Sequence, residues 1–198
     1  MEEKKRTFGW KKSKIDSSIS IYDNTDKNDL EVYNRVATMP VIDQGEESSC
    51  VSQTIYELYG FYCKNILGKE NDITPTYVYY KRHNKGDGMT CRDAFEILQS
   101  EGKIGSFAKI ESVDSIKHAI LSNGGVMLAV KVYDSTINDF WDGSGRLEGG
   151  HAITALGFDE KYLYFKNSWG ETYGKNGRWK FPLKKINSKL YEAWTITS

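Results

Sequence analysis

The chain has 198 residues, and its 27 Lys and Arg residues balance 27 Asp and Glu residues, so the formal net charge is zero. A chain of this length can form one large domain or two small ones around a buried core. The zero net charge argues against a nucleic-acid or anionic-membrane binder, and the 39% hydrophobic and 13% aromatic content argues against disorder.

The chain also lacks the usual signals for a membrane or for secretion. Its longest near-apolar stretch, residues 126–133, is interrupted by Lys131, and no apolar segment follows the charged N-terminus. Cys50, Cys63 and Cys91 are too few for a disulfide framework and, like the three histidines, too dispersed for a metal site. We therefore expect no membrane span, no metal or cofactor, and a reducing, cytoplasmic location.

Residues 1–40 mix charged residues with isolated apolar ones and show no sustained helical period. This pattern predicts an extended arm laid over the body of the protein. Its aromatic residues, among them Phe8 and Trp10, are expected to anchor it.

Residues 41–124 read as a mainly helical lobe. The first helix begins after Ser48 and Ser49 and ends at Gly68, because apolar residues recur every three or four positions between them. Cys50 then lies in its first turn. Three more helices are predicted, from Thr74 with Pro75 at the first helical position, from Thr90 to about Gly102, and from Asp114 to about Ser122.

Residues 125–198 read as a mainly β lobe, a mostly antiparallel sheet or partial, barrel-like sheet. Short β-rich runs occupy residues 126–133, 151–158, 162–166 and 178–181, with a tight hairpin at Asp159 and Glu160. Helices followed by strands predict an α+β fold in a single domain of two lobes, with a cleft between them.

Cys50 is the first residue with a reactive signal. A lone cysteine is more often a buried, inert thiol. A helix N-terminus, however, favours an anion and would stabilise the thiolate form of Cys50. Cys63 and Cys91 are expected to be core thiols within helices.

His151 and Asn167 complete a candidate constellation. The preceding Gly149 and Gly150 leave room for a substrate near the imidazole, whereas a structural histidine would not need them. The predicted hairpin pairs the strand that begins at His151 with the strand that ends at Asn167. Cysteine, histidine and asparagine would then act as nucleophile, base and orienting group in acyl transfer.

These segments resemble the papain-like cysteine peptidases, a family that the Cys-His-Asn triad characterises. The resemblance lies in the stretch from Asp43 to Cys50, in the histidine block at residues 150–153, and in the asparagine block at residues 166–177. Softer similarity over Phe8–Gly9–Trp10, the region from Thr74, residues 88–94 and residues 192–196 extends to a compact bacterial, archaeal and viral subgroup.

The resemblance implies a role for each matching residue. Cys50, His151 and Asn167 would form the triad of an endopeptidase, with Gln44 as the oxyanion donor and Trp169 shielding the His–Asn bond. The substrate-binding residues would be Gly88, Met89, Thr90, Ala129, Gly150, Ala152 and Trp169, of which Met89, Ala129 and Ala152 would line an apolar pocket. The expected partner is a protein or peptide substrate, bound by a monomer.

Two departures keep other functions open. Glu47 and Val51 stand where the family usually has a cysteine and a tryptophan or tyrosine, and Glu46 and Glu47 bring negative charge near the nucleophile. A catalytically weak or inactive binding module is one alternative. An amidase or acyl transferase acting on a non-protein substrate is another, because the same triad serves any activated carbonyl.

Overall fold

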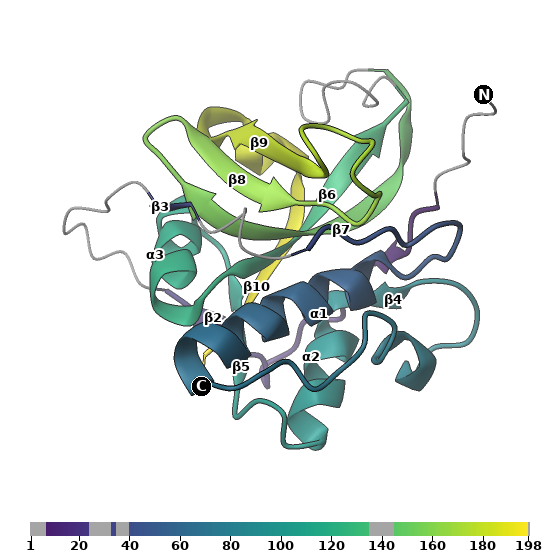
Figure 1. Ribbon diagram of the computed structural model, residues 1–198, viewed down its shortest axis with the longest axis vertical. Coiled ribbons are helices and arrows are strands. Elements are labelled where there is room, and N and C mark those ends of the chain that lie inside the picture. The colour runs from purple at the N-terminus through teal and green to yellow at the C-terminus, as the bar shows by residue number, and fades with distance from the viewer. Residues whose placement is uncertain (1–6, 24–32, 35–39, 135–144, 198) are drawn as a thin grey trace.

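The computed structural model describes residues 7–23, 33–34, 40–134 and 145–197 (Figure 1). A large twisted sheet forms one half, and helices α1 (Cys50–Tyr62) and α2 (Cys91–Ser100) form the other. Helix α1 runs along the boundary and packs on strands β6 (Val126–Tyr133) and β7 (Leu147–Phe158). The α+β prediction is confirmed.

Local signals position the helices of the first half. Helix α1 begins at Cys50 and passes into a π-helical turn, Cys63–Leu67, which ends at Gly68 with φ 63°. Thr90 caps α2, since its Oγ1 accepts a hydrogen bond from the backbone N–H of Asp93 at 3.0 Å. Both helix starts agree with the sequence prediction.

The prediction of a helix that begins at Thr74 is wrong. Only a short 3₁₀ turn, Tyr79–Lys81, forms there. The hydroxyl of Ser52 in α1 donates to Pro75 O at 2.8 Å and accepts from Tyr79 N at 3.2 Å. These contacts satisfy backbone groups without a helix, so packing against α1 overrides the local N-terminal signal.

The main sheet is mostly antiparallel. Its strand order is β2-β5-β10-β6-β7-β8-β9, with β3 (Tyr33–Asn34) paired to β7. The strands are β2 (Ile21–Tyr22), β5 (Phe107–Ile110), β8 (Tyr162–Lys166), β9 (Arg178–Pro182) and β10 (Leu190–Ile196), besides β6 and β7. Strands β6 and β8 match the predicted bounds, and β7 begins four residues earlier than expected, at Leu147 instead of His151.

The predicted boundary at residue 125 does not separate the sheet from the helices, because strands β5 and β10 pair across it and helix α3 (Val113–Asn123) packs against the sheet. Strand β5 and helix α3 precede residue 125, yet β5 pairs with β10 and α3 packs in the core beneath the sheet. Strand β10 lies between β5 and β6, with Trp194 fully buried. The sheet therefore takes strands from both halves of the sequence.

The described part of the N-terminal arm is extended, as predicted. Strand β1 (Trp10–Lys11) pairs in parallel with β4 (Met89–Thr90), and β2 pairs in parallel with β5. Trp10 packs against the buried core around α1 and α2, and Phe8 and Tyr22 pack against the buried core between the sheet and α3. The arm thus contacts both halves of the protein.

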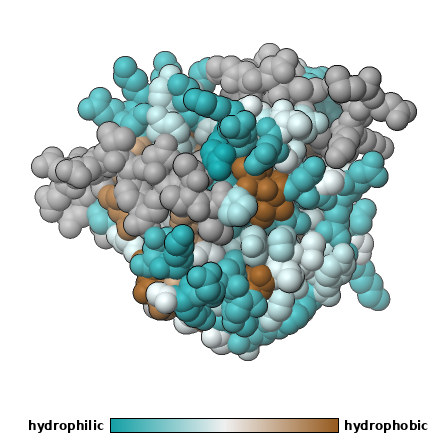
Figure 2. Space-filling view, viewed as in Figure 1, coloured by the Kyte–Doolittle hydropathy of each residue, from teal (hydrophilic) through white to brown (hydrophobic). Residues whose placement is uncertain are grey.

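The face in Figure 2 is mainly hydrophilic, with small separate apolar patches. Scattered apolar residues are normal on a protein surface. Among the described residues, no helix is both long and apolar enough to cross a bilayer.

Candidate active site

Cys50 is the first residue of α1, as predicted, but its side chain has no exposed surface. Burial raises the pKa of the Cys50 thiol from 9.0 to about 11, against hydrogen bonds from backbone N–H groups of Ala152 and Gly9 that lower it. The expected stabilisation of the thiolate is therefore outweighed by desolvation in this conformation.

His151 and Asn167 lie side by side, with His151 Nε2 2.7 Å from Asn167 Oδ1. The same Oδ1 accepts from the backbone N–H of Ser168 at 2.7 Å, which identifies that atom as the oxygen. Nε2 must then donate its proton, and Nδ1 is left as the basic nitrogen of the neutral ring. Both side chains are buried.

Two aromatic rings surround the imidazole. The ring of Trp169 lies 4.6 Å from that of His151, centroid to centroid, with an interplanar angle of 31°. Phe8 meets His151 and Trp169 edge-on at 6.4 and 6.3 Å. These rings screen the His151–Asn167 hydrogen bond from water, which strengthens it.

Gln44 is held between two loops. Its backbone N–H donates to Ser168 O at 2.8 Å, and its Oε1 accepts from Ser168 Oγ at 2.6 Å. Its Nε2 donates to Glu47 O at 2.8 Å and to Thr7 O at 3.4 Å. The amide proposed as an oxyanion donor is thus engaged with two backbone carbonyls.

The predicted substrate wall at residues 88–90 carries a strand of the protein itself. Met89 N donates to Gly9 O at 2.8 Å, and β4 pairs Met89 with Trp10 and Thr90 with Lys11. Gly88 has φ 72°, and a Cβ there would lie 2.4 Å from Gly9 O. The wall can therefore bind an extended chain, and only glycine allows the close approach at position 88.

The predicted pocket residues are brought together across the sheet. Ala129 pairs with Ala152 on one side and with Glu192 on the other. Met89 belongs to the same core cluster as both alanines, and Trp10 packs against it. A Cβ at Gly150 would lie 2.1 Å from the Trp10 ring, so the ring lies directly against that backbone.

The sequence analysis assigned no role to three residues of this region, Tyr191, Glu192 and Trp194. Tyr191 stacks on Trp10 at 4.4 Å, and the buried carboxylate of Glu192 accepts from Ser13 N at 2.8 Å and from Trp194 Nε1 at 2.9 Å. Their signal was the β-rich composition of residues 190–196, in which aromatic and β-branched residues are typical of a strand.

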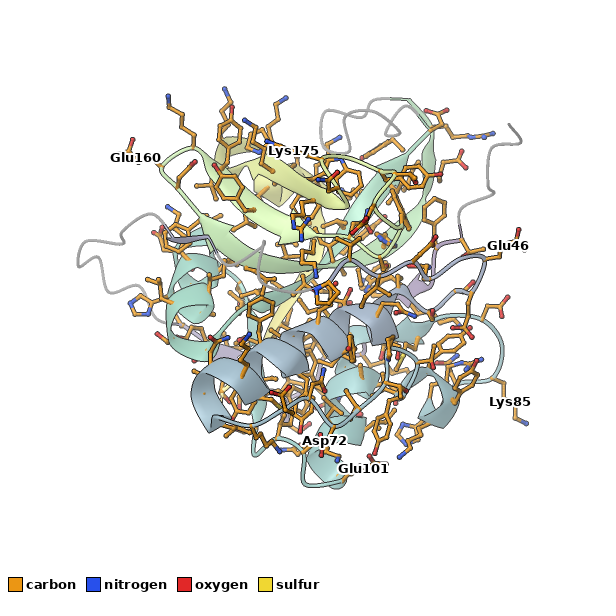
Figure 3. All side chains as sticks on the ribbon, viewed as in Figure 1. Glu46, Asp72, Lys85, Glu101, Glu160 and Lys175 are labelled. Atoms are coloured by element: carbon orange, nitrogen blue, oxygen red, sulfur yellow. The ribbon has the colours of Figure 1, made fainter. Side chains whose placement is uncertain are left out.

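The other ionisable candidates lie outside this arrangement. Glu46 projects into solvent (Figure 3), and the Glu47 carboxylate accepts from Tyr80 OH at 3.0 Å, so neither adds a charge beside Cys50. Cys63 and Cys91 are buried free thiols, although Cys91 begins α2 instead of lying within it. Among the described residues, no group of three or more His, Cys, Asp or Glu side chains could hold a metal ion.

Solved structures share this fold. Xylellain, a cysteine protease from Xylella fastidiosa, superposes with a TM-score of 0.82 at 17% identity, covering 100% of this chain and 98% of its own. Procathepsin B S9 from Trypanosoma congolense gives 0.76 at 13% identity, covering 96% of this chain and 86% of its own. At these identities the likeness shows the fold alone.

Sequence comparison gives the family. An uncharacterized peptidase C1-like protein, L477 of Acanthamoeba polyphaga mimivirus, is 31% identical over 87 residues, which cover 38% of this chain and 28% of the viral protein. The match therefore spans just over a quarter of that relative's length. A sequence model of the family described as papain family cysteine protease matches residues 26–193, which is most of the chain. The chain therefore belongs to the papain family of cysteine proteases.

Proposed function

We propose that the protein is an endopeptidase that hydrolyses peptide bonds through Cys50, His151 and Asn167. The observation that carries this proposal is the 2.7 Å contact between His151 Nε2 and Asn167 Oδ1. His151 directly precedes Ala152, whose backbone N–H donates to the sulfur of Cys50. Because Nε2 donates to Asn167, Nδ1 is the ring nitrogen that exchanges a proton with the thiol in this proposal.

The reaction divides into two steps. The Cys50 thiol gives its proton to His151 Nδ1, and the sulfur attacks the substrate carbonyl. The C–N bond then breaks as His151 returns that proton to the leaving amine, which leaves a thioester on Cys50. A water molecule gives a proton to His151, attacks the thioester and releases the acid, and the thiol is restored.

Gln44 and the backbone N–H of Cys50 are the proposed donors to the oxyanion. The two hydrogen bonds between Gln44 and Ser168 hold Gln44 in place, so its amide needs to move little during the reaction. Removing one such donor typically costs about 2.7–4 kcal/mol of transition-state stabilisation. Asn167 orients the imidazole, and Trp169 keeps water from their hydrogen bond.

Met89, Ala129 and Ala152 support a preference for a hydrophobic side chain two residues before the cut. All three are fully buried in one apolar cluster, and Trp10 packs against that cluster, so displacing Trp10 would leave an apolar surface for a large side chain. A library of peptides varied at that position is the measurement, and a strict basic preference would contradict the assignment.

An inactive binding module is the second candidate, and one observation favours it. Cys50 is completely buried, and burial raises the pKa of its thiol to about 11, so the thiol is neutral at physiological pH. A protein with no further use for the nucleophile could keep it in this state. Hydrolysis of a non-protein amide uses the same residues and differs only in the substrate.

One experiment separates these functions. Denatured protein is incubated with the wild-type chain and with the Cys50→Ala variant, and the cut sites are identified by mass spectrometry. We expect cuts from the wild type alone, blocked by a thiol-reactive epoxide. Equal cutting by Cys50→Ala refutes the nucleophile, and no cutting by either, despite epoxide labelling of Cys50, favours a non-protein substrate.

A further inference from the structure

We propose that a basic hollow beside strands β8 and β9 binds acidic segments of protein partners, at a distance from Cys50. The hollow has a volume of about 490 Å³, and the described residues that line it are 160–162 and 182–185. A volume of this order is typical of a ligand site. The binding stands on these residues alone, and only its consequence for substrate choice rests on the proposed function.

Two backbone segments form the walls of the basic hollow. Tyr162 pairs with Pro182 across the two strands, and the Leu183 N–H donates to Lys161 O at 2.9 Å. The chain then makes a 3₁₀ turn, Leu183–Lys185, which the buried side chain of Ile186 anchors in the core. The sheet and the core therefore hold the walls in place before any ligand arrives.

Lysine side chains surround the hollow from both walls. Lys161 lies on one wall, and Lys184 and Lys185 lie on the other, all three exposed to solvent. Lys180 adjoins them, since its Nζ lies 4.2 Å from the centre of the Tyr162 ring. Four ammonium groups thus gather on one small surface.

The carboxylates nearest in sequence do not neutralise these lysines. Asp159 accepts from the backbone N–H groups of Lys161 and Tyr162 at 2.7 and 2.6 Å, and from Tyr164 OH at 2.6 Å. Glu160 projects from the tip of the β7–β8 hairpin into solvent (Figure 3). Asp159 therefore stabilises the hairpin turn, and Glu160 points away from the hollow.

The positive charge of this surface is in excess. Residues 159–189 contain eight Lys and Arg residues against three Asp and Glu residues, although the whole chain has no net charge. Among the described residues, no carboxylate forms an ion pair with Lys161, Lys180 or Lys184, whereas cations elsewhere are paired at N–O distances of 2.5–2.8 Å, as in Lys81–Glu101, Arg92–Asp16, Lys103–Asp72 and Lys109–Glu111. The hollow can therefore attract an external anion.

The other lining residues favour an acidic polypeptide among the possible anions. Tyr162, Pro182 and Leu183 place apolar surface between the lysines, so an apolar side chain flanked by carboxylates fits both parts of the lining. Each ammonium is a compact point charge that a single carboxylate can pair with. Nucleic acids and anionic membranes fit less well, because their binding draws on many phosphate contacts and the chain has no net positive charge.

The basic hollow lies outside the candidate active site. It adjoins Tyr162, the first residue of β8, whereas Asn167 directly follows the last residue of that strand. At about 3.3 Å per residue, the strand separates the two by roughly 15 Å. In the proposed function, an acidic segment about five or more residues from the cut would therefore tether a protein substrate while the reacting groups stay uncovered.

Binding is tested in the full chain with Cys50→Ala, so that the probe is not cut. The probe is a fluorescently labelled peptide of glutamates around one leucine, and the same peptide with glutamines is the neutral control. Fluorescence anisotropy at low salt gives Kd. We expect the double change Lys161→Gln with Lys184→Gln to raise Kd about tenfold, and Lys64→Gln with Lys85→Gln to leave it unaltered.

The second double variant is matched to the first. Lys64 and Lys85 are exposed and form no ion pair with a described residue, and Lys85 projects into solvent (Figure 3). Both double variants therefore remove the same charge, and thermal unfolding should be the same in each. Added salt should weaken binding of the glutamate peptide, because it screens exposed charges.

Two results would overturn the proposed site. One is an equal rise of Kd in the two double variants, and the other is equal binding of the glutamate and glutamine peptides. Competition tests the kind of partner. If single-stranded DNA or phosphatidylserine vesicles displace the peptide at lower concentrations than unlabelled peptide does, the assignment to an acidic polypeptide is wrong.

Cleavage by the chain with Cys50 intact tests the link to the proposed function. A substrate protein extended with the glutamate peptide should show a lower KM than the unextended protein, with kcat unchanged, and Lys161→Gln with Lys184→Gln should abolish this difference. Peptide binding without any cleavage keeps the basic hollow as a binding site but refutes the proposed function. Cleavage without peptide binding and without an effect of the extension on KM does the reverse.

Discussion

Lys166 Nζ lies 3.1 Å from Glu57 Oε1, and both side chains are buried. Glu57 belongs to α1, and Lys166 ends β8, directly before Asn167. Burial raises the pKa of the Glu57 carboxyl and lowers that of the Lys166 ammonium, while the attraction between them opposes both shifts. The pair ties the nucleophile's helix to the strand that carries the orienting asparagine.

Removing one partner of this pair should be strongly destabilising. Glu57→Gln leaves the Lys166 ammonium buried without a counter-charge, which we expect to lower the free energy of unfolding by about 3–5 kcal/mol. Denaturant unfolding measures it. Glu111→Gln, which breaks the exposed pair with Lys109, is the control and should cost about 1 kcal/mol or less. The double variant Glu57→Leu with Lys166→Met should regain most of the loss, and equal costs for Glu57→Gln and Glu111→Gln would contradict the assignment.

The order of the main elements could be predicted from the sequence because their signals are local. Apolar spacing and Gly68 define α1, and Thr90 with Asp93 defines the start of α2. The helix predicted from Thr74 failed because its signal, a cap followed by proline, is equally local, while its outcome is decided by Ser52 from another element.

The site could be predicted in part for the same reason. Position in the chain and the predicted hairpin were enough to bring His151 beside Asn167. The burial of Cys50 could not be predicted, because it depends on Gly9, which lies 41 residues away in sequence. The ion pair between Lys166 and Glu57 could not be predicted either. A lysine at the end of a β-rich run did indicate that its charge would need a buried partner.

Asn167 should act by fixing the tautomer of His151. In Asn167→Ala, Nε2 loses its acceptor, so the proton can move to Nδ1 and the ring is no longer held. We expect kcat to fall, but by less than the about 10²–10⁴-fold loss expected for His151→Ala, which removes the acid and base itself. Steady-state kinetics of the two variants on one peptide give the comparison. A wild-type kcat for Asn167→Ala would remove Asn167 from the mechanism.

Gly177 should matter for the loop that follows the triad. It has φ 70°, its carbonyl accepts from Asn167 N at 3.1 Å, and a Cβ there would lie 2.3 Å from Val41 Cγ1. Gly177→Ala should therefore lower both stability and activity. Gly68→Ala is the matched control, since Gly68 has φ 63° but open space around it, and should cost only the about 1–2 kcal/mol of a left-handed residue. Thermal unfolding of both variants decides, and equal costs would show that contact with Val41 is unimportant.

The pH dependence of Cys50 alkylation should report whether Gly9 covers its sulfur. Burial raises the pKa of the thiol to about 11, so the neutral form predominates at neutral pH and only a small fraction can react. In the wild type the alkylation rate should therefore keep rising with pH toward a midpoint near 11. In Gly9→Ala the added Cβ would clash with Ser48 O, so Gly9 moves away and solvent returns to the sulfur. The helix N-terminus then favours the anion, and the midpoint should fall to or below the ordinary value of 9.0. Rates measured from pH 6 to pH 11 on both proteins give the two curves, and identical midpoints would mean that residues other than Gly9 keep the sulfur from water.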